Sequence, residues 1–286
     1  MKKILREWLL PPAIFILVKS FIFKIKSFIK YNNIYFAKNK EIKNLHIDKR
    51  CFIIGLGTSI NKQDLKLLKD EIVIGISSLF NHKDLEYIQP NYYVLSPVID
   101  YHSKYVNKDN LIKWLQAMDE KLDNSVVMFI YIGDKKYIDE NKIFKNKNIY
   151  WLNYEPWDGR DISDIKLDKI PSISNISEVA LSVALYLGFK EINIIGFDLT
   201  WYEGVYKYYD DKKVNQFFGK TQYDVKKEHN FDSESHMRAH AEVFKKFKAL
   251  YQMKQNIFNA NADENSYVDT FPKVKYEDLF EKKEDK

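Results

Sequence analysis

Short apolar segments alternate with segments of helical spacing along most of the chain, and this alternation restricts the fold more than any other feature. Strands that alternate with helices form parallel sheets covered by helices on their faces. The pattern therefore predicts an α/β fold with a Rossmann-like, mainly parallel sheet flanked by helices. The predicted strands are 51–54, 71–76, 92–95, 126–131, 148–152, 191–195 and 255–259, and the predicted helices are 62–68, 110–121, 177–187 and 234–253.

Length and composition fit one such domain with an extension at each end. The 286 residues are 45% hydrophobic, which is enough for a buried core. The sequence predicts an arm over 1–45, a folded domain over 46–275 and a disordered charged tail over 276–286. Cys51 is the single cysteine, so it forms no internal disulfide, and nothing in the cysteine content indicates a secreted protein.

The arm carries the positive charge of the chain. Residues 1–50 hold twelve Lys or Arg and three acidic residues, although the net charge of the whole chain is only +5. The apolar run 9–18 is shorter than the roughly 20 residues of a spanning helix, and no small-residue cleavage site follows it. Bulky apolar residues mixed with lysines favour a helix in the membrane interface, contacting anionic lipid through residues 1–30. The alternative is an amphipathic helix packed on its own domain. Nucleic-acid binding is not expected, because the arm is rich in aliphatic residues.

The segment CFIIGLGTSI, residues 51–60, indicates a buried strand that ends in a glycine-rich turn. Ligands of parallel sheets bind beyond the carboxyl ends of the strands. Gly55 and Gly57 can take positive φ and let backbone N–H groups approach an anion, while Thr58 and Ser59 can cap a helix from about residue 61. Ile60 stands where the dinucleotide fingerprint needs its third glycine. The turn is therefore either a phosphate site or an ordinary strand-to-helix connection.

A second segment, residues 171–209, carries a family resemblance. A helix ending in ALYLGFKEI is followed by a strand and by GFD, residues 196–198. Together with the G-x-G-x-S turn, this segment resembles the bacterial sialyltransferases of glycosyltransferase family 42 and the related MptE-like domains. The resemblance covers about residues 51–261. It implies a nucleotide-binding site made of Gly55, Gly57, Thr58, Ser59, Ser78, Ser96, Ser174, Asn175, Ser177 and Asp198. From the residues alone, Asp198 is equally a loop cap or a ribose contact.

The resemblance also implies the catalytic groups. Tyr206 and Tyr202 would stabilise the leaving phosphate, and His236 would act as the general base toward an acceptor hydroxyl. His240 lies one helical turn further and competes with His236 for this role. The tyrosines belong either to an aromatic surface patch or to a lid over residues 201–231. The spacing of His236 and His240 suits zinc, but no third ligand is in register, so neither a metal nor a cofactor is expected.

The expected function is a metal-independent, inverting glycosyltransferase that moves an acidic sugar, either a sialic acid-like nonulosonic acid or Kdo, from a CMP-sugar donor. The acceptor would be a glycan or glycolipid precursor of a surface polysaccharide such as lipopolysaccharide. The enzyme would be peripheral, on the cytoplasmic face of the bacterial inner membrane. Homo-oligomerisation stays open. Two alternatives remain: an MptE-like ATP-dependent diphosphokinase, which requires a divalent metal, and a non-catalytic membrane-tethered binding domain, suggested by Leu56 and Ile173, which depart from the family pattern.

Overall fold

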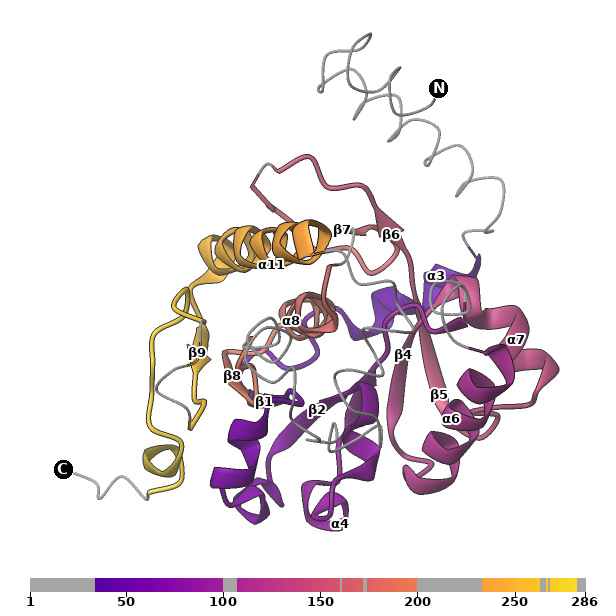
Figure 1. The fold of residues 1–286 in the computed structure, drawn as a ribbon, viewed down its shortest axis with the longest axis horizontal. Helices are drawn as coiled ribbons and strands as arrows, with labels where there is room; N and C mark the ends of the chain where they lie inside the picture. Colours follow the sequence, from indigo (N-terminus) through magenta and orange to yellow (C-terminus); the bar gives the residue numbers. More distant parts are fainter. Residues whose placement is uncertain are drawn as a thin grey trace, which may run out of the picture.

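A seven-stranded sheet forms the centre of the protein, and every strand pair in it is parallel. The strand order is β5-β4-β3-β2-β1-β8-β9, which Figure 1 shows with helices on both faces. A second, two-stranded parallel sheet joins β6 to β7. The computed structural model describes residues 34–99, 107–159, 161–171, 174–199, 233–262, 266 and 268–281.

The strands are β1 (Arg50–Ile54), β2 (Ile72–Ile76), β3 (Tyr92–Val94), β4 (Val127–Tyr131), β5 (Asn148–Leu152), β6 (Tyr154–Glu155), β7 (Ile170–Pro171), β8 (Glu191–Ile195) and β9 (Ile257–Asn259). The α-helices are α3 (Ile34–Ala37), α4 (Leu85–Ile88), α6 (Lys108–Lys121), α7 (Lys135–Glu140), α8 (Ile176–Leu187) and α11 (Ser233–Lys254). The 3₁₀ helices are η1 (Lys38–Ile42), η2 (Thr58–Lys62), η3 (Leu65–Leu68), η4 (Ser77–Asn81), η5 (Ile132–Asp134) and η6 (Glu277–Leu279).

The predicted α/β architecture is confirmed. All seven predicted strands are present in the large sheet, and three of the four predicted helices correspond to α6, α8 and α11. The helix predicted over 62–68 is wrong, because this segment contains the end of η2 and the separate 3₁₀ helix η3. Asp64 lies between the two and caps η3 by accepting a hydrogen bond from the N–H of Lys66. A capping side chain in this position starts a new turn and interrupts a continuous helix.

Side-chain alternation along the strands divides the core into two layers. Cys51 and Ile53 of β1 pack in the layer that contains α8 and α11, and Phe52 and Ile54 pack in the layer that contains α6. All four side chains are fully buried. Successive side chains of a strand point to opposite faces of the sheet, so a strand that is apolar at every position must be covered on both faces. Figure 1 shows this arrangement.

Helix α8 is the central helix of its layer and is apolar nearly all round. It contacts β1, β2 and β3, and its residues from Ser177 to Leu187 are buried. Its start is fixed by Asn175, whose side chain accepts from the N–H of Ser177. It ends at Gly188, which takes the left-handed conformation with φ +82° that favours glycine.

Packed structure extends beyond the predicted domain limits of 46 and 275. In the part predicted as the arm, Asn39 and Ile42 are buried, and the N–H of Asn44 donates to the carbonyl of Tyr186. In the part predicted as a disordered tail, Tyr276 is buried and Phe280 stacks on Phe52. The remaining arm, 1–33, and the end of the tail, 282–286, lie outside the described residues, as does the whole of the predicted lid, 201–231. Among the described helices, none is long and apolar enough to cross a membrane.

Candidate functional site

The order of the strands reverses at β1, which makes the β1–β8 pair a topological switch point. The chain runs outward from β1 through β2, β3 and β4 to β5, and later returns to β8 on the other side of β1. In open parallel sheets, connections on either side of such a point diverge, and ligands bind there beyond the carboxyl ends of the strands. The glycine-rich turn after β1 and the Gly-Phe-Asp turn after β8 meet at this point.

The glycines are required because the two turns approach too closely for side chains. The N–H of Gly57 donates to the carbonyl of Gly196 at 2.8 Å, and that of Gly55 donates to Ile195 at 2.7 Å. A Cβ atom on Gly57 would overlap the carboxyl group of Asp198 and lie 2.7 Å from the carbonyl oxygen of Gly196. The positive φ predicted for Gly55 and Gly57 is wrong, however. Gly57 has φ −64°, and in this pair of turns the positive φ is that of Gly196, at +67°.

Ser59 and Asp198 join the two turns by side-chain bonds. The N–H of Ser59 donates to Oδ2 of Asp198 at 3.0 Å, and the hydroxyl of Ser59 contacts Oδ1. Both residues are almost completely buried. The helix predicted to start at about residue 61 is wrong, because η2 already begins at Thr58 and contains both Thr58 and Ser59. The hydroxyl of Ser59 is directed to the aspartate instead, as expected of a loop cap at Asp198.

The end of β9 holds the Gly-Phe-Asp turn from its other side. Asn261 accepts from the N–H of Phe197 at 2.9 Å and donates to its carbonyl at 3.0 Å. Ser266 also donates to the carbonyl of Phe197. Sequence reasoning missed Asn261, although an asparagine just beyond a predicted strand was a usable signal. The turn that carries Asp198 is therefore fixed by β1 and by β9.

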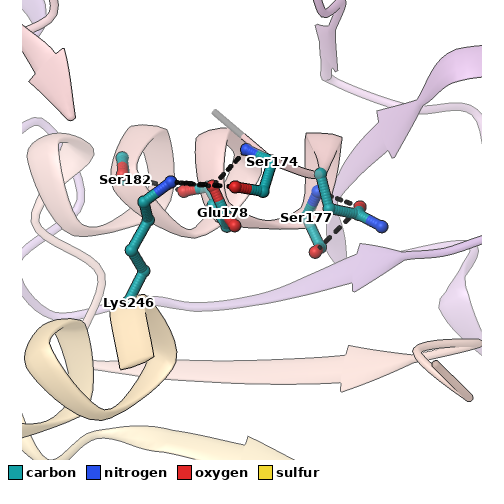
Figure 2. A network of polar contacts seen from close by, with 6 residues as sticks. Ser174, Ser177, Glu178, Ser182 and Lys246 are labelled. Atoms are coloured by element: carbon teal, nitrogen blue, oxygen red, sulfur yellow. Dashed lines mark hydrogen bonds and ion pairs between the residues drawn. The ribbon is translucent and has the colours of Figure 1, made fainter. Parts of the chain in front are cut away.

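The start of α8 carries three of the predicted nucleotide contacts, and the structure gives each of them a partner. Asn175 accepts from both the N–H and the hydroxyl of Ser177 at 3.0 Å. The N–H of Ser174 donates to Oε2 of Glu178 at 3.0 Å, which closes a capping arrangement around the first turn (Figure 2). Because α8 leads into β8 and runs antiparallel to it, this turn lies at the carboxyl edge of the sheet. The N–H groups of Ser174 and Ser177 and the hydroxyl of Ser177 are therefore already bonded within the protein.

Glu178 forms a buried ion pair with Lys246 of α11, which Figure 2 shows reaching across to α8. Nζ of Lys246 lies 3.1 Å from Oε2 of Glu178, and the two side chains are 4% and 3% exposed. Nζ also lies 3.4 Å from the hydroxyl of Ser174. Oε1 of Glu178 is buried and has no hydrogen-bond partner among the described residues. Burial raises the pKa of the Glu178 carboxyl, although the positive charge of Lys246 opposes this shift.

The next two strands place Ser78 and Ser96 at the same edge. Ser78 follows β2 and is buried, and its hydroxyl accepts from the indole N–H of Trp114 at 3.1 Å. Ser96 follows β3 and is half-buried. Beside it, the carboxylate of Asp134 accepts from the N–H groups of Val98 and Ile99 at 2.7 and 3.0 Å. Asp134 was missed by sequence reasoning, although Gly133-Asp134 after β4 repeats the pattern of a glycine and an aspartate beyond a strand.

The predicted catalytic residues are described only in part. Tyr202 and Tyr206 lie outside the described residues, as does the lid predicted over 201–231. His236 lies in the first turns of α11, but its side chain is not described. His240 lies one turn further and is half-buried. Because α11 leads toward β9, its first turns lie near the carboxyl edge of the sheet. The structure therefore brings the helix of the two histidines to the edge that holds Asp198 and Ser174.

Within the described ranges, no three His, Cys, Asp or Glu side chains are grouped as metal ligands would be. The seven parallel strands between two helical layers place the chain among the α/β proteins, and the strand order is compatible with a Rossmann-like fold. Comparisons of the chain with protein-family models, with curated proteins and with solved structures gave no match. What can be inferred about the function therefore comes from the geometry of the site and from the motifs that resemble those of the sialyltransferases.

Proposed function

We propose that the protein is a sialyltransferase-like glycosyltransferase that binds a CMP-sugar at the β1–β8 switch point and transfers an acidic sugar to a glycan or glycolipid acceptor. Transfer proceeds with inversion, without a metal or cofactor. The donor sugar is a nonulosonic acid of the sialic type or Kdo. The product belongs to a surface polysaccharide such as lipopolysaccharide.

The contact between Ser59 and Asp198 carries this proposal. The resemblance depends on two motifs that are separated by well over a hundred residues, and each belongs to the nucleotide-sugar site of the family that they resemble. If the resemblance were accidental, nothing would require these motifs to meet. In the structure Ser59 and Asp198 are hydrogen-bonded, and the start of α8 lies at the same edge.

The described residues suggest a division of roles. The turn from Gly55 to Ser59 lies beyond the carboxyl end of β1 and is proposed to receive the donor phosphate there. Asp198 holds this turn against β8. His236 is proposed as the base toward the acceptor hydroxyl, with Tyr206 and Tyr202 on the leaving phosphate. An inverting transfer needs only these functions: a base, stabilisation of the departing phosphate, and positioning.

The location proposed for the enzyme is the cytoplasmic face of the bacterial inner membrane. Residues 1–30 supply the membrane contact, since seven basic residues and one acidic residue accompany their apolar run. A peripheral position of this kind brings the enzyme to lipid-linked acceptors while leaving the donor site open to soluble nucleotide sugars.

The decisive experiment is a thermal-shift screen of the full chain against CMP, CDP, UDP, GDP and ATP, each with magnesium and with chelator. A ligand that binds only the native state raises the melting temperature in proportion to the logarithm of its concentration above Kd. CMP is expected to stabilise the protein in the presence of chelator. Hydrolysis of a CMP-sugar in the same buffer then measures activation of the donor.

Other outcomes would replace the proposal. Stabilisation by ATP that requires magnesium, with no response to CMP, would indicate the diphosphokinase activity of MptE-like proteins. Binding of CMP without hydrolysis or transfer would indicate a binding domain. No response to any nucleotide would remove the nucleotide site from the switch point.

A further inference from the structure

A short turn over residues 43–49, just before β1, exposes two aliphatic side chains. Leu45 is 52% exposed and Ile47 is 62% exposed. Among the described residues, seven large hydrophobic side chains are exposed, and four of them lie between Ile34 and Ile47. Single exposed hydrophobic residues are common on protein surfaces, but a concentration of this kind in one short stretch is not.

The turn is held firmly in place, so the exposure is a property of the fold. The N–H of His46 donates to the carbonyl of Leu187 at 2.9 Å. The ring of His46 points inward, where it stacks on Phe189 at 4.6 Å and contacts the hydroxyl of Tyr92 at 2.6 Å. Leu45 and Ile47 flank this inward ring and remain at the surface.

Lysines surround the two aliphatic side chains. Lys43 and Lys49 stand on either side of the turn, and the N–H of Lys190 donates to the carbonyl of Lys49 at 2.8 Å. All three lysines are exposed. Asp48 lies in the turn as well, and Lys43 pairs with Asp164 at 3.1 Å, so the net positive charge here is small. The turn therefore offers chiefly apolar surface with a basic rim.

The composition of the chain before the turn indicates that the partner of this apolar surface is a lipid bilayer. Residues 1–33 lead directly into α3, only some ten residues before the turn, and contain the apolar run 9–18 together with seven of the basic residues. A single weak membrane signal gives marginal, reversible binding, and stable association takes two signals. An arm and a fixed apolar turn at the same end of the chain supply such a pair.

We infer that the turn Lys43–Lys49 is a second membrane-binding element, in which Leu45 and Ile47 insert into the interface of an anionic bilayer while Lys49 and Lys190 contact its headgroups. The inference rests on the proposed membrane contact of residues 1–30 and is independent of the proposed chemistry. It also orients the domain. The turn precedes β1, whereas the candidate site follows β1, so the two lie at opposite edges of the sheet, separated by about 16 Å of strand. The site would thus face away from the bilayer, toward acceptor chains that extend from it.

The test places a probe directly on the turn. Cys51 is the single cysteine and is fully buried, so an Ile47→Cys variant can be labelled selectively with an environment-sensitive fluorophore. Leu67→Cys is the matched control, because Leu67 is 41% exposed and lies in η3, whose Leu65 and Leu68 pack in the layer that contains α6. With vesicles of phosphatidylglycerol and phosphatidylcholine, the probe at residue 47 is expected to shift to the blue and the probe at residue 67 to stay unchanged.

Cosedimentation with the same vesicles provides the second measurement. Leu45→Ser with Ile47→Ser is expected to weaken binding of the full chain about tenfold, since each change removes several methyl or methylene groups from the interface. Leu67→Ser with Met237→Ser, which removes two other exposed apolar side chains, is expected to leave binding unchanged.

Any one of three results would overturn the inference. The Leu45/Ile47 variant could bind as strongly as the wild type, the probe at residue 47 could stay unshifted, or the full chain could fail to bind the vesicles. The nucleotide response is measured separately. Vesicle binding without any nucleotide response would count against the proposed function alone.

Discussion

Ser59 and Asp198 are 139 residues apart in the chain, and the N–H of Ser59 donates to the Asp198 carboxylate at 3.0 Å. This contact joins the turn after β1 to the turn after β8 at the point where the strand order reverses. It explains why a buried aspartate follows β8: its charge is placed against donors of the neighbouring turn.

Removing the carboxylate should loosen both turns. Asp198→Ala leaves the N–H and hydroxyl of Ser59 without their buried acceptor, so the free energy of unfolding should fall by about 2–4 kcal/mol. Ser59→Ala removes only the hydroxyl and should cost about 1–2 kcal/mol. Urea unfolding measures both values. Equal losses in the two variants would mean that the backbone bond contributes little.

The closeness of the turns makes Gly57 intolerant of any side chain. Gly57→Ala places a Cβ against Asp198 and Gly196 and should destabilise the protein by about 1–3 kcal/mol. It should also abolish the thermal response to CMP, because the displaced turn no longer admits a phosphate. Gly159→Ala is the comparison, since a Cβ there meets nothing within 4 Å although φ is +85°. The Gly159→Ala variant should keep the thermal response to CMP. If both variants lost this response, the loss in Gly57→Ala would not be evidence for a site at the turn.

The buried pair of Glu178 and Lys246 should behave as a unit. Lys246→Met leaves a buried carboxylate without its cation and should cost about 3–5 kcal/mol, and Glu178→Gln should cost a similar amount by removing the negative charge that faces the buried Lys246 ammonium. The double variant should recover most of this loss, because it buries no charge and keeps an acceptor for the Ser174 N–H. Urea unfolding of the four proteins completes the cycle. Additive losses would show that the two groups are not coupled.

Stability should also depend on the protonation of His46. Burial, and to a lesser extent the charge of Lys49, lowers the pKa of His46 below its ordinary value of 6.5. The unfolded chain therefore binds a proton before the folded chain does, so stability is lost as the pH falls below about 6.5. His46→Phe should reduce the difference between urea midpoints measured at pH 7.5 and pH 5. Because burial also lowers the pKa of His82, part of the loss should persist. An unchanged difference would exclude His46 as a source.

Variants of the two histidines of α11 should distinguish donor binding from sugar transfer. If His236 removes the acceptor proton, His236→Ala should lower the transfer rate by roughly 10²-fold or more and leave the CMP thermal shift unchanged. His240→Ala is the control one helical turn along. Loss of transfer in the His240 variant alone would move the role to that residue. Full transfer in both variants would remove histidine from the mechanism.

The sequence by itself determined the strands, the main helices and the parallel class of the sheet, since these follow from local patterns of apolar residues. It also located the two turns of the candidate site by their glycines. It did not predict that residues 62–68 form 3₁₀ turns, because the capping side chain of Asp64 interrupts the helical spacing there.

The partners of the site residues were decided only by the tertiary structure. The contacts of Ser59 with Asp198, of Asn261 with Phe197 and of Glu178 with Lys246 join segments that no local pattern relates. Even the need for glycine at position 57 is tertiary: its φ suits most residues, and a side chain is excluded by Gly196 and Asp198, which are distant from Gly57 in the sequence. Steric exclusion and buried hydrogen bonds act between atoms that are close in space. Which residues become neighbours in this way is determined by how the whole sheet packs.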